Sequence, residues 1–159
     1  MAILQSGKGM HMNNKLVTTK EMFQKAYRGH YAIGAFNVNH MELIQAVVGT
    51  AGRLRSPVIV QASSFTAKYA DLGYFVDITN HAAELAGVPV ALHLDHGESF
   101  EVIRQFIEAG FTSVMIDGSH LSFGENVAVT KEVCDYAHAL GITVEGELGT
   151  ISGIEDAVS

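Results

Sequence analysis

The stretch VPVALHLDHG, residues 88–97, determines the fold that the sequence predicts. Residues 90–94 form a short and mainly apolar run, which indicates a buried strand. The segment then ends in two ionisable side chains and a turn residue, and apolar packing does not account for them. Because charged groups are rarely buried unless they are paired or bound to a metal, Asp95 and His96 are candidate functional residues.

Short apolar segments of this kind alternate with helical patterns along the chain. Alternation in units of roughly 25–30 residues is typical of βαβ crossovers and a parallel sheet. Two α/β architectures fit this pattern, a doubly wound open sheet and part of an eight-stranded barrel. The first strand–helix junction, residues 37–40, contains no glycine fingerprint for a dinucleotide, which weakens the doubly wound interpretation. The predicted strands are residues 31–38, 57–62, 90–94, 112–116 and 142–147.

Capping signals and apolar periodicity place the helices. A leading helix is predicted to begin at a capping box formed by Thr18 and Glu21, and later helices are predicted to begin at Asn39, Ser99 and Ser122. Residues 102, 103, 106 and 107 should face inward on the helix after Ser99. The buried faces predicted for the helices after the first and fourth strands are Leu43, Val47, Ala51 and Leu54, and Val129, Val133, Tyr136 and Leu140.

Composition limits the class of protein. The 159 residues suffice for one domain with a real core, and 48% hydrophobic residues with 17% charged residues argue against disorder. A formal charge of -7 without a basic stripe argues against nucleic acid or an anionic membrane as partner. No apolar run approaches the ~20 residues of a membrane span. The single cysteine, Cys134, indicates a small buried hydrophobe in a reduced compartment, which predicts a cytoplasmic location.

The first residues of the chain fit no structural pattern. Residues 1–11 look like an expression leader ahead of a native start at Met12, and we expect them to be disordered. The predicted domain is therefore 12–159.

Polar side chains recur where the predicted strands end. In parallel α/β folds these ends lie together on one face, where ligands bind. A lone example would more often be a helix cap or a loop group, and it is the recurrence that indicates a site. His93, on the same face of its strand as Asp95, is predicted to be a buried supporting residue. The strand-end residues are Asn37, Gln61, Ser63, Asp95, His96, Asp117 and Glu147.

The roles of these residues remain open at this level. His96 could be a metal ligand or a general base, and Asp95 could be a base or a partner that orients it. Glu147 should point into the barrel or cleft. Asp117 could instead cap a turn with Gly118.

Six segments of the sequence together resemble one known protein family, and the resemblance is specific. The chain resembles the zinc-dependent class II aldolases of fructose and tagatose bisphosphate from about Leu16 to Asp156. The resemblance implies a TIM-type (β/α)8 barrel, of which this chain would hold the leading helix and about the first five strands. It also implies cleavage of a ketose 1,6-bisphosphate to dihydroxyacetone phosphate and glyceraldehyde 3-phosphate. The strings are LVTTKEM, YAIGAFNVN, SPVIVQAS, VPVALHLDHG, GFTSVMIDGSHLSFGENVAVTKEV and VEGELGTISGIED.

The resemblance also implies a role for each candidate. His96 resembles a ligand of the catalytic Zn²⁺, a cofactor beside which a monovalent cation could bind. Asp95 resembles the acid/base at the substrate hydroxyl, and Glu155 the residue that exchanges the proton on the α-carbon. The remaining matches are Glu147 and Asp117 near an alternative metal position, and Asn37, Ser63 and Gln61 as substrate contacts.

Some parts of the family's site have no counterpart in the sequence. Catalytic zinc takes three protein ligands and keeps an open position, and the family supplies two further histidines and its phosphate-binding loops from its last strands. We therefore expect an aldolase by descent whose site is incomplete in this chain. Open sheet edges invite pairing, so we also expect a homo-oligomer or association with another chain. The alternatives are a non-catalytic half-barrel and another metal-dependent lyase, and the choice between fructose and tagatose bisphosphate stays open.

Overall fold

The computed structural model describes residues 15–149 of the chain. The predicted leader and Glu155 lie outside the described residues. The five predicted strands are all present, each joined to the next by at least one helix. The elements are α1 Thr19–Gly29, β1 Gly34–Asn37, α2 Met41–Leu54, β2 Val58–Ser63, α3 Ser64–Tyr69, α4 Leu72–Ala86, β3 Val90–Gly97, α5 Phe100–Ala109, β4 Ser113–Ile116, α6 Phe123–Ala139 and β5 Thr143–Gly146.

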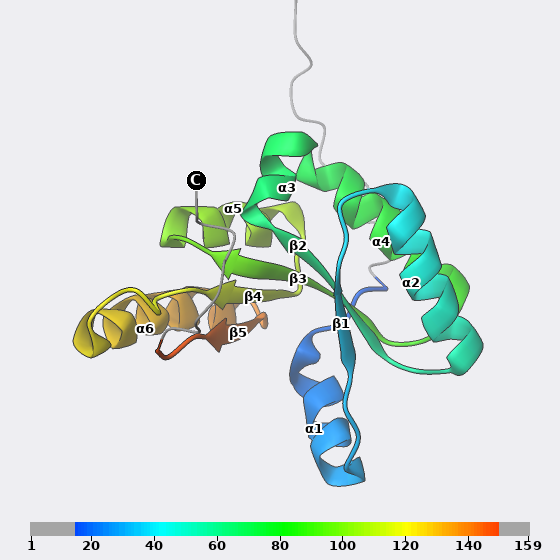
Figure 1. Ribbon diagram of the computed structural model, residues 1–159, viewed down its shortest axis with the longest axis horizontal. Coiled ribbons are helices and arrows are strands. Elements are labelled where there is room, and N and C mark those ends of the chain that lie inside the picture. The colour runs from blue at the N-terminus through cyan, green and yellow to red at the C-terminus, as the bar shows by residue number, and fades with distance from the viewer. Residues whose placement is uncertain (1–14, 150–159) are drawn as a thin grey trace, which may run out of the picture.

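The strands form one parallel sheet in the order β1-β2-β3-β4-β5. Strands that are consecutive in sequence are therefore neighbours in space, and the order never reverses as it does in a doubly wound sheet. Figure 1 shows the curved sheet with α2 and α4 covering one part of its outer side and α5 and α6 another. This topology is that of a barrel wall, and it decides between the two architectures that the sequence left open.

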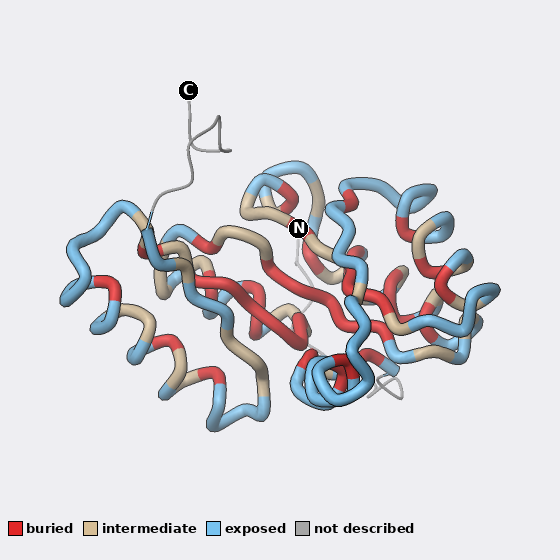
Figure 2. Tube along the Cα trace, turned by 60° about the horizontal axis from the view of Figure 1, so that its bottom comes forward, coloured by how far each residue is buried: buried red, intermediate tan, exposed pale blue. Residues whose placement is uncertain are grey.

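The core lies between the sheet and the outer helices, and β3 runs through its centre. Val90, Leu92 and Leu94 are fully buried and pack with α5. Phe106 of α5 meets Phe111, which follows the helix, edge to face with 4.8 Å between the ring centroids. Figure 2 shows this buried centre, with exposed backbone along the outer sides of the helices. The inward face predicted for α5 is confirmed, and it anchors the strand that carries the candidate site.

The predicted face of α2 is wrong in part. Ala51 is buried, but Leu43 and Leu54 are 37% and 72% exposed, and the helix packs through Ile44 and Val48 instead. Apolar residues stand side by side in this helix, so periodicity alone does not separate two faces one residue apart. Packing against α4 and β2 makes the choice.

The end of α6 differs from its prediction in a similar way. Val133 is buried as predicted, whereas Leu140 lies beyond the last helical residue and is 57% exposed. Asn126 and Ala137 complete the buried face of the helix. A polar residue at a buried position was not expected from the apolar pattern.

The capping predictions have mixed outcomes. Ser122 forms the predicted capping box with Glu125, and Ser99 caps α5. Thr18 makes no side-chain capping bond. The residue that caps α2 is His40 rather than Asn39, because the imidazole Nδ1 accepts a hydrogen bond from the backbone N–H of Leu43 at 3.4 Å.

No helix within residues 15–149 is both long enough and apolar enough to cross a membrane.

Candidate active site

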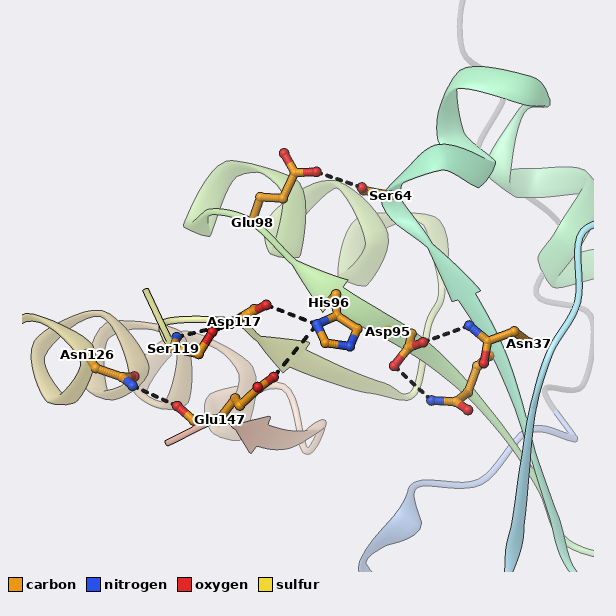
Figure 3. Close-up of polar contacts among 10 residues, drawn as sticks. Asn37, Ser64, Asp95, His96, Glu98, Asp117, Ser119, Asn126 and Glu147 are labelled. Carbon is orange, nitrogen blue, oxygen red and sulfur yellow. Dashed lines mark hydrogen bonds and ion pairs between the residues drawn. The ribbon is translucent and has the colours of Figure 1, made fainter. Parts of the chain in front are cut away.

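The end of β3 departs from regular strand geometry at His96. The pairing of β3 with β4 is irregular between Leu94 and Gly97, and His96 has a φ of 51°. A residue other than glycine in this left-handed region carries a cost of about 1–2 kcal/mol. Bulges of this kind re-aim side chains next to functional sites. Here the bulge turns Asp95 and His96, adjacent in sequence, towards different groups of partners (Figure 3).

Asp95 points towards the ends of β1 and β2. Its Oδ2 accepts a hydrogen bond from Asn37 Nδ2 at 2.7 Å, and its Oδ1 accepts one from Gln61 Nε2 at 3.0 Å. Two neutral amides therefore orient one carboxylate. Each carboxylate oxygen can accept more than one hydrogen bond, so Asp95 can still receive a proton from a ligand.

His96 points the other way, towards the ends of β4 and β5. Its Nδ1 lies 2.9 Å from Asp117 Oδ2 and 3.8 Å from Glu147 Oε2. Each of the three side chains offers one ligand atom, and these atoms lie within 4.8 Å of one another. The strand ends thus bring together one imidazole and two carboxylates from positions 96, 117 and 147.

Hydrogen bonding sets the charges in this group. The bond to Asp117 raises the pKa of His96, although burial opposes it. Burial would raise the pKa of Asp117, but hydrogen bonds from Ser119 and His96 outweigh it and hold that pKa below its ordinary value. Both pKa shifts favour the charged forms, an imidazolium beside a carboxylate, and a metal ion that binds this nitrogen competes with its proton.

The three side chains fit a divalent metal. An imidazole nitrogen with two carboxylate oxygens is a donor set that zinc accepts, and three protein ligands leave a position open for a substrate oxygen. The close approach of the two carboxylates fits the same conclusion, because a cation would neutralise their mutual repulsion.

Two oxygens of Asp117 serve two purposes. Oδ1 accepts hydrogen bonds from the backbone N–H of Ser119 at 3.0 Å and from its hydroxyl at 2.6 Å, which forms a turn, while Oδ2 faces His96. The turn-capping and metal-binding interpretations of Asp117 are therefore compatible. The Asp-Gly-Ser sequence is a turn signature that could have identified Ser119.

Asn126 is the supporting residue for which the sequence carries no signal. Its Nδ2 donates to the backbone carbonyl of Glu147 at 2.7 Å. It lies inside α6, and its partner is far along the chain, so neither spacing nor periodicity connects them.

Ser63 follows Gln61 on β2 and lines a hollow of about 440 Å³. Asn37, Phe65 and Tyr69 line the same hollow, which therefore adjoins one of the two amides that hold Asp95. Ser63 makes no side-chain capping bond to α3. The next residue, Ser64, donates to Glu98 Oε1 at 3.1 Å and ties the segments after β2 and β3 together (Figure 3).

His93 is buried as predicted, with 3% of its surface exposed. Its Nδ1 lies 2.8 Å from Ser113 Oγ, and its Nε2 lies 3.6 Å from a carboxylate oxygen of Glu145. Burial lowers the pKa of His93 to about 4, so its imidazole is neutral near neutral pH. Its supporting role remains a prediction.

Known aldolases are similar to this chain in sequence. The family model described as "Fructose-bisphosphate aldolase class-II" matches residues 17–159. The fructose-bisphosphate aldolase of Treponema pallidum is 49% identical over 150 residues, which cover 90% of this chain and 45% of the relative. The 6-phospho-5-dehydro-2-deoxy-D-gluconate aldolase of Halalkalibacterium halodurans is 47% identical over 148 residues, which cover 90% of this chain and 51% of the relative.

A solved structure shows the same architecture. The YdjI aldolase from Escherichia coli K12 superposes with a TM-score of 0.81 at 36% sequence identity, over 89% of this chain and 54% of that one. The five strands described here thus form part of a TIM-type barrel. The chain spans about half the length of the curated relatives it matches.

Proposed function

Because the chain belongs to the class II fructose-bisphosphate aldolase family, we propose that the strand ends around β3 form the metal-binding and proton-transfer part of an aldolase site. The observation that carries this proposal is that the bulge at the end of β3 directs Asp95 and His96 towards different partners. Asp95 is oriented by two amides, while the adjacent His96 joins two carboxylates. On this proposal, Asp95 is a proton acceptor that lies beside the metal position without occupying it.

The proposed reaction is cleavage of a ketose 1,6-bisphosphate, fructose or tagatose, to dihydroxyacetone phosphate and glyceraldehyde 3-phosphate. A bound Zn²⁺ would supply Lewis-acid stabilisation of the negative charge that develops on the ketone fragment. His96, Asp117 and Glu147 would hold it. A monovalent cation beside it is part of the same proposal.

Asp95 would take the proton of the substrate hydroxyl at the bond being cleaved. The electrons of that O–H bond then form the aldehyde carbonyl, and the electrons of the broken carbon–carbon bond remain on the ketone fragment. The fragment becomes dihydroxyacetone phosphate when its carbon takes up a proton. We propose Glu155, outside the described residues, as the source of that proton.

The substrate class is a phosphorylated sugar derivative that carries a ketone. The substrates that give both relatives their names carry phosphate, and one of them is not a bisphosphate. We propose that Asn37 and Ser63 contact the substrate from the hollow beside Asp95. We propose Gln61, the other residue that donates to Asp95, as a further substrate contact. A cytoplasmic location belongs to the same proposal, since the single cysteine can form no intramolecular disulfide.

A zinc titration with a coupled aldol-cleavage assay tests the proposal on the complete gene product that contains these residues. We expect one tightly held ion per chain, and cleavage that chelation abolishes and zinc restores. His96→Ala should lower zinc affinity at least about 100-fold, because the loss of a ligand should exceed the 10–100-fold effect of residues that only support one. Binding should be tighter at mildly alkaline than at acidic pH, because the proton on His96 competes with the metal.

The matched control is His138→Ala, which removes an exposed imidazole on α6 and should leave zinc affinity unchanged. Equal zinc affinity in His96→Ala and the unsubstituted protein would contradict the ligand assignment. A panel of fructose bisphosphate, tagatose bisphosphate and 6-phospho-5-dehydro-2-deoxy-D-gluconate separates the substrates.

A second candidate function is a non-catalytic half-barrel that associates with itself or another chain. It is favoured by β1, whose residues are all exposed and which pairs only with β2 among the described strands. Phe36 on this strand is 49% exposed, and Leu54 of α2 beside it is 72% exposed. An open strand edge with apolar neighbours favours pairing with another strand.

Sedimentation over a range of protein concentrations tests this association. We expect the isolated 159-residue chain to form homo-oligomers and Phe36→Lys to weaken them, because a charge on an edge strand opposes pairing. Tyr74→Lys, at an exposed aromatic residue of α4, is the control and should associate normally. A monomer at every concentration would remove this candidate.

A further inference from the structure

Asn126 is a buried polar residue in the first turns of α6, with 6% of its surface exposed. Both ends of its amide are used. Nδ2 donates to the backbone carbonyl of Glu147 at 2.7 Å, and Oδ1 accepts from Thr130 Oγ1 at 3.1 Å. A buried amide is tolerated only when it is hydrogen-bonded, so this one is held between α6 and the segment after β5.

The same amide lies against the segment after β4. A Cβ atom added at Gly118 would meet Asn126 Oδ1 at 2.4 Å and Asn126 Cγ at 2.7 Å. Real Cβ atoms do not approach so closely, so the Asn126 side chain occupies the space that any larger residue at position 118 would need. Gly118 directly follows Asp117. One side chain therefore lies against both segments that carry the carboxylates facing His96, and Figure 3 shows its hydrogen bond to Glu147.

These contacts occur where the sheet no longer joins the two segments. The pairing of β4 with β5 extends to Ile116 and Gly146. Asp117 and Glu147 follow immediately, each one residue beyond the last pair. A hydrogen bond from the Asn126 side chain to the Glu147 carbonyl thus holds the segment after β5 just beyond the last backbone pair of β4 and β5.

We propose that Asn126 is a positioning residue that sets the separation of the Asp117 and Glu147 carboxylates and so determines how tightly the site around His96 holds a divalent cation. This inference rests on the metal site proposed above. Asn126 itself acts only through the backbone of its neighbours. Supporting residues of this kind typically contribute 10–100-fold to metal affinity, because ligands that are not held in place adopt the binding geometry only part of the time.

Cobalt binding gives a readout that does not depend on turnover. The visible absorption of bound Co²⁺ reports the number and geometry of its ligands, and the affinity follows from the same titration. We expect Asn126→Ala to lower Co²⁺ affinity 10–100-fold and to weaken the absorption, because Glu147 withdraws and water replaces it. Thr130→Val is the matched control, since it removes the other hydrogen bond of the same amide and should leave the spectrum unchanged.

A double-mutant cycle separates positioning from general destabilisation. Gly118→Ala should lower Co²⁺ affinity in the unsubstituted protein, because the added methyl displaces the Asn126 amide. In the Asn126→Ala background that amide is gone, so the same substitution should have no further effect. Residues in contact are non-additive in this way, whereas two independent losses of stability would add.

The outcomes separate the two proposals. If the unsubstituted protein binds no Co²⁺, the proposed metal site is wrong, and the inference about Asn126 is wrong with it. If it binds Co²⁺ and Asn126→Ala binds it with the same affinity and spectrum, the metal site stands and the positioning role is wrong. Should Asn126→Ala fail to fold, Gly118→Ala takes its place, and unchanged cobalt binding by that variant would overturn the positioning role.

Discussion

Replacing Asp95 with asparagine is expected to lower kcat for aldol cleavage about 10²–10⁴-fold, the usual contribution of a positioned acid or base. Asparagine has nearly the same shape and can stay between the amides of Asn37 and Gln61, which would adjust to its single acceptor oxygen. It cannot take the proton of the substrate hydroxyl. The effect should fall on kcat rather than on KM, because an interaction made only during proton transfer is lost.

The measurement uses steady-state cleavage by the complete gene product and zinc affinity of the same preparations. Zinc affinity should fall much less than in His96→Ala, because Asp95 is turned away from His96 and its carboxylate partners and only a nearby negative charge is lost (Figure 3). Asp77→Asn makes the same chemical change at an exposed position of α4 and should keep full activity. An Asp95→Asn protein with unimpaired kcat would show that another group accepts the proton.

The free energy of unfolding should fall by roughly 3 kcal/mol through His93 as the pH drops from about 6.5 to about 4. Burial lowers the pKa of His93 over this interval, so the unfolded chain binds a proton that the folded chain does not. Above this interval both states are neutral at His93, and below it both are protonated. The loss is therefore confined to the window between the two pKa values.

Chemical denaturation at a series of pH values measures this loss. His93→Asn does not titrate and can place its amide beside Ser113, so its stability should change less over the same window. Partial burial raises the pKa of Glu145, an effect of opposite sign, but its side chain is 58% exposed and solvent weakens the contribution. Parallel curves for His93→Asn and the unsubstituted protein would contradict the prediction.

The elements of the fold could be predicted because their signals are local. The three central strands contain short apolar runs, and several helices begin or end at residues such as Ser99, Ser122 or Gly87 whose preferences act within one turn. The buried face of α5 could be predicted for the same reason. The α2 face did not, because Leu43 and Ile44 are both apolar and only contact with other elements selects one of them.

The candidate site also divides into features that the local sequence predicts and features that depend on contacts between elements. The chemistry of Asp95 and His96 is visible in the string HLDHG, but regular strand alternation would send His96 to the outer side with Leu94, which packs in the core. The left-handed backbone at His96 turns it instead towards Asp117 and Glu147. That conformation accompanies an irregular pairing with β4, which no property of residues 93–97 alone specifies.

Residue types and their spacing were therefore enough for the alternating fold, for its central strand and for the list of groups able to do chemistry. The tertiary structure alone decided which of these groups meet. Asn126 contacts Gly118 and Glu147, and His96 reaches two carboxylates, because segments distant in sequence become neighbours at the ends of adjacent strands. Periodicity and capping act over a few residues, whereas the geometry of this site depends on register and helix packing across the whole sheet.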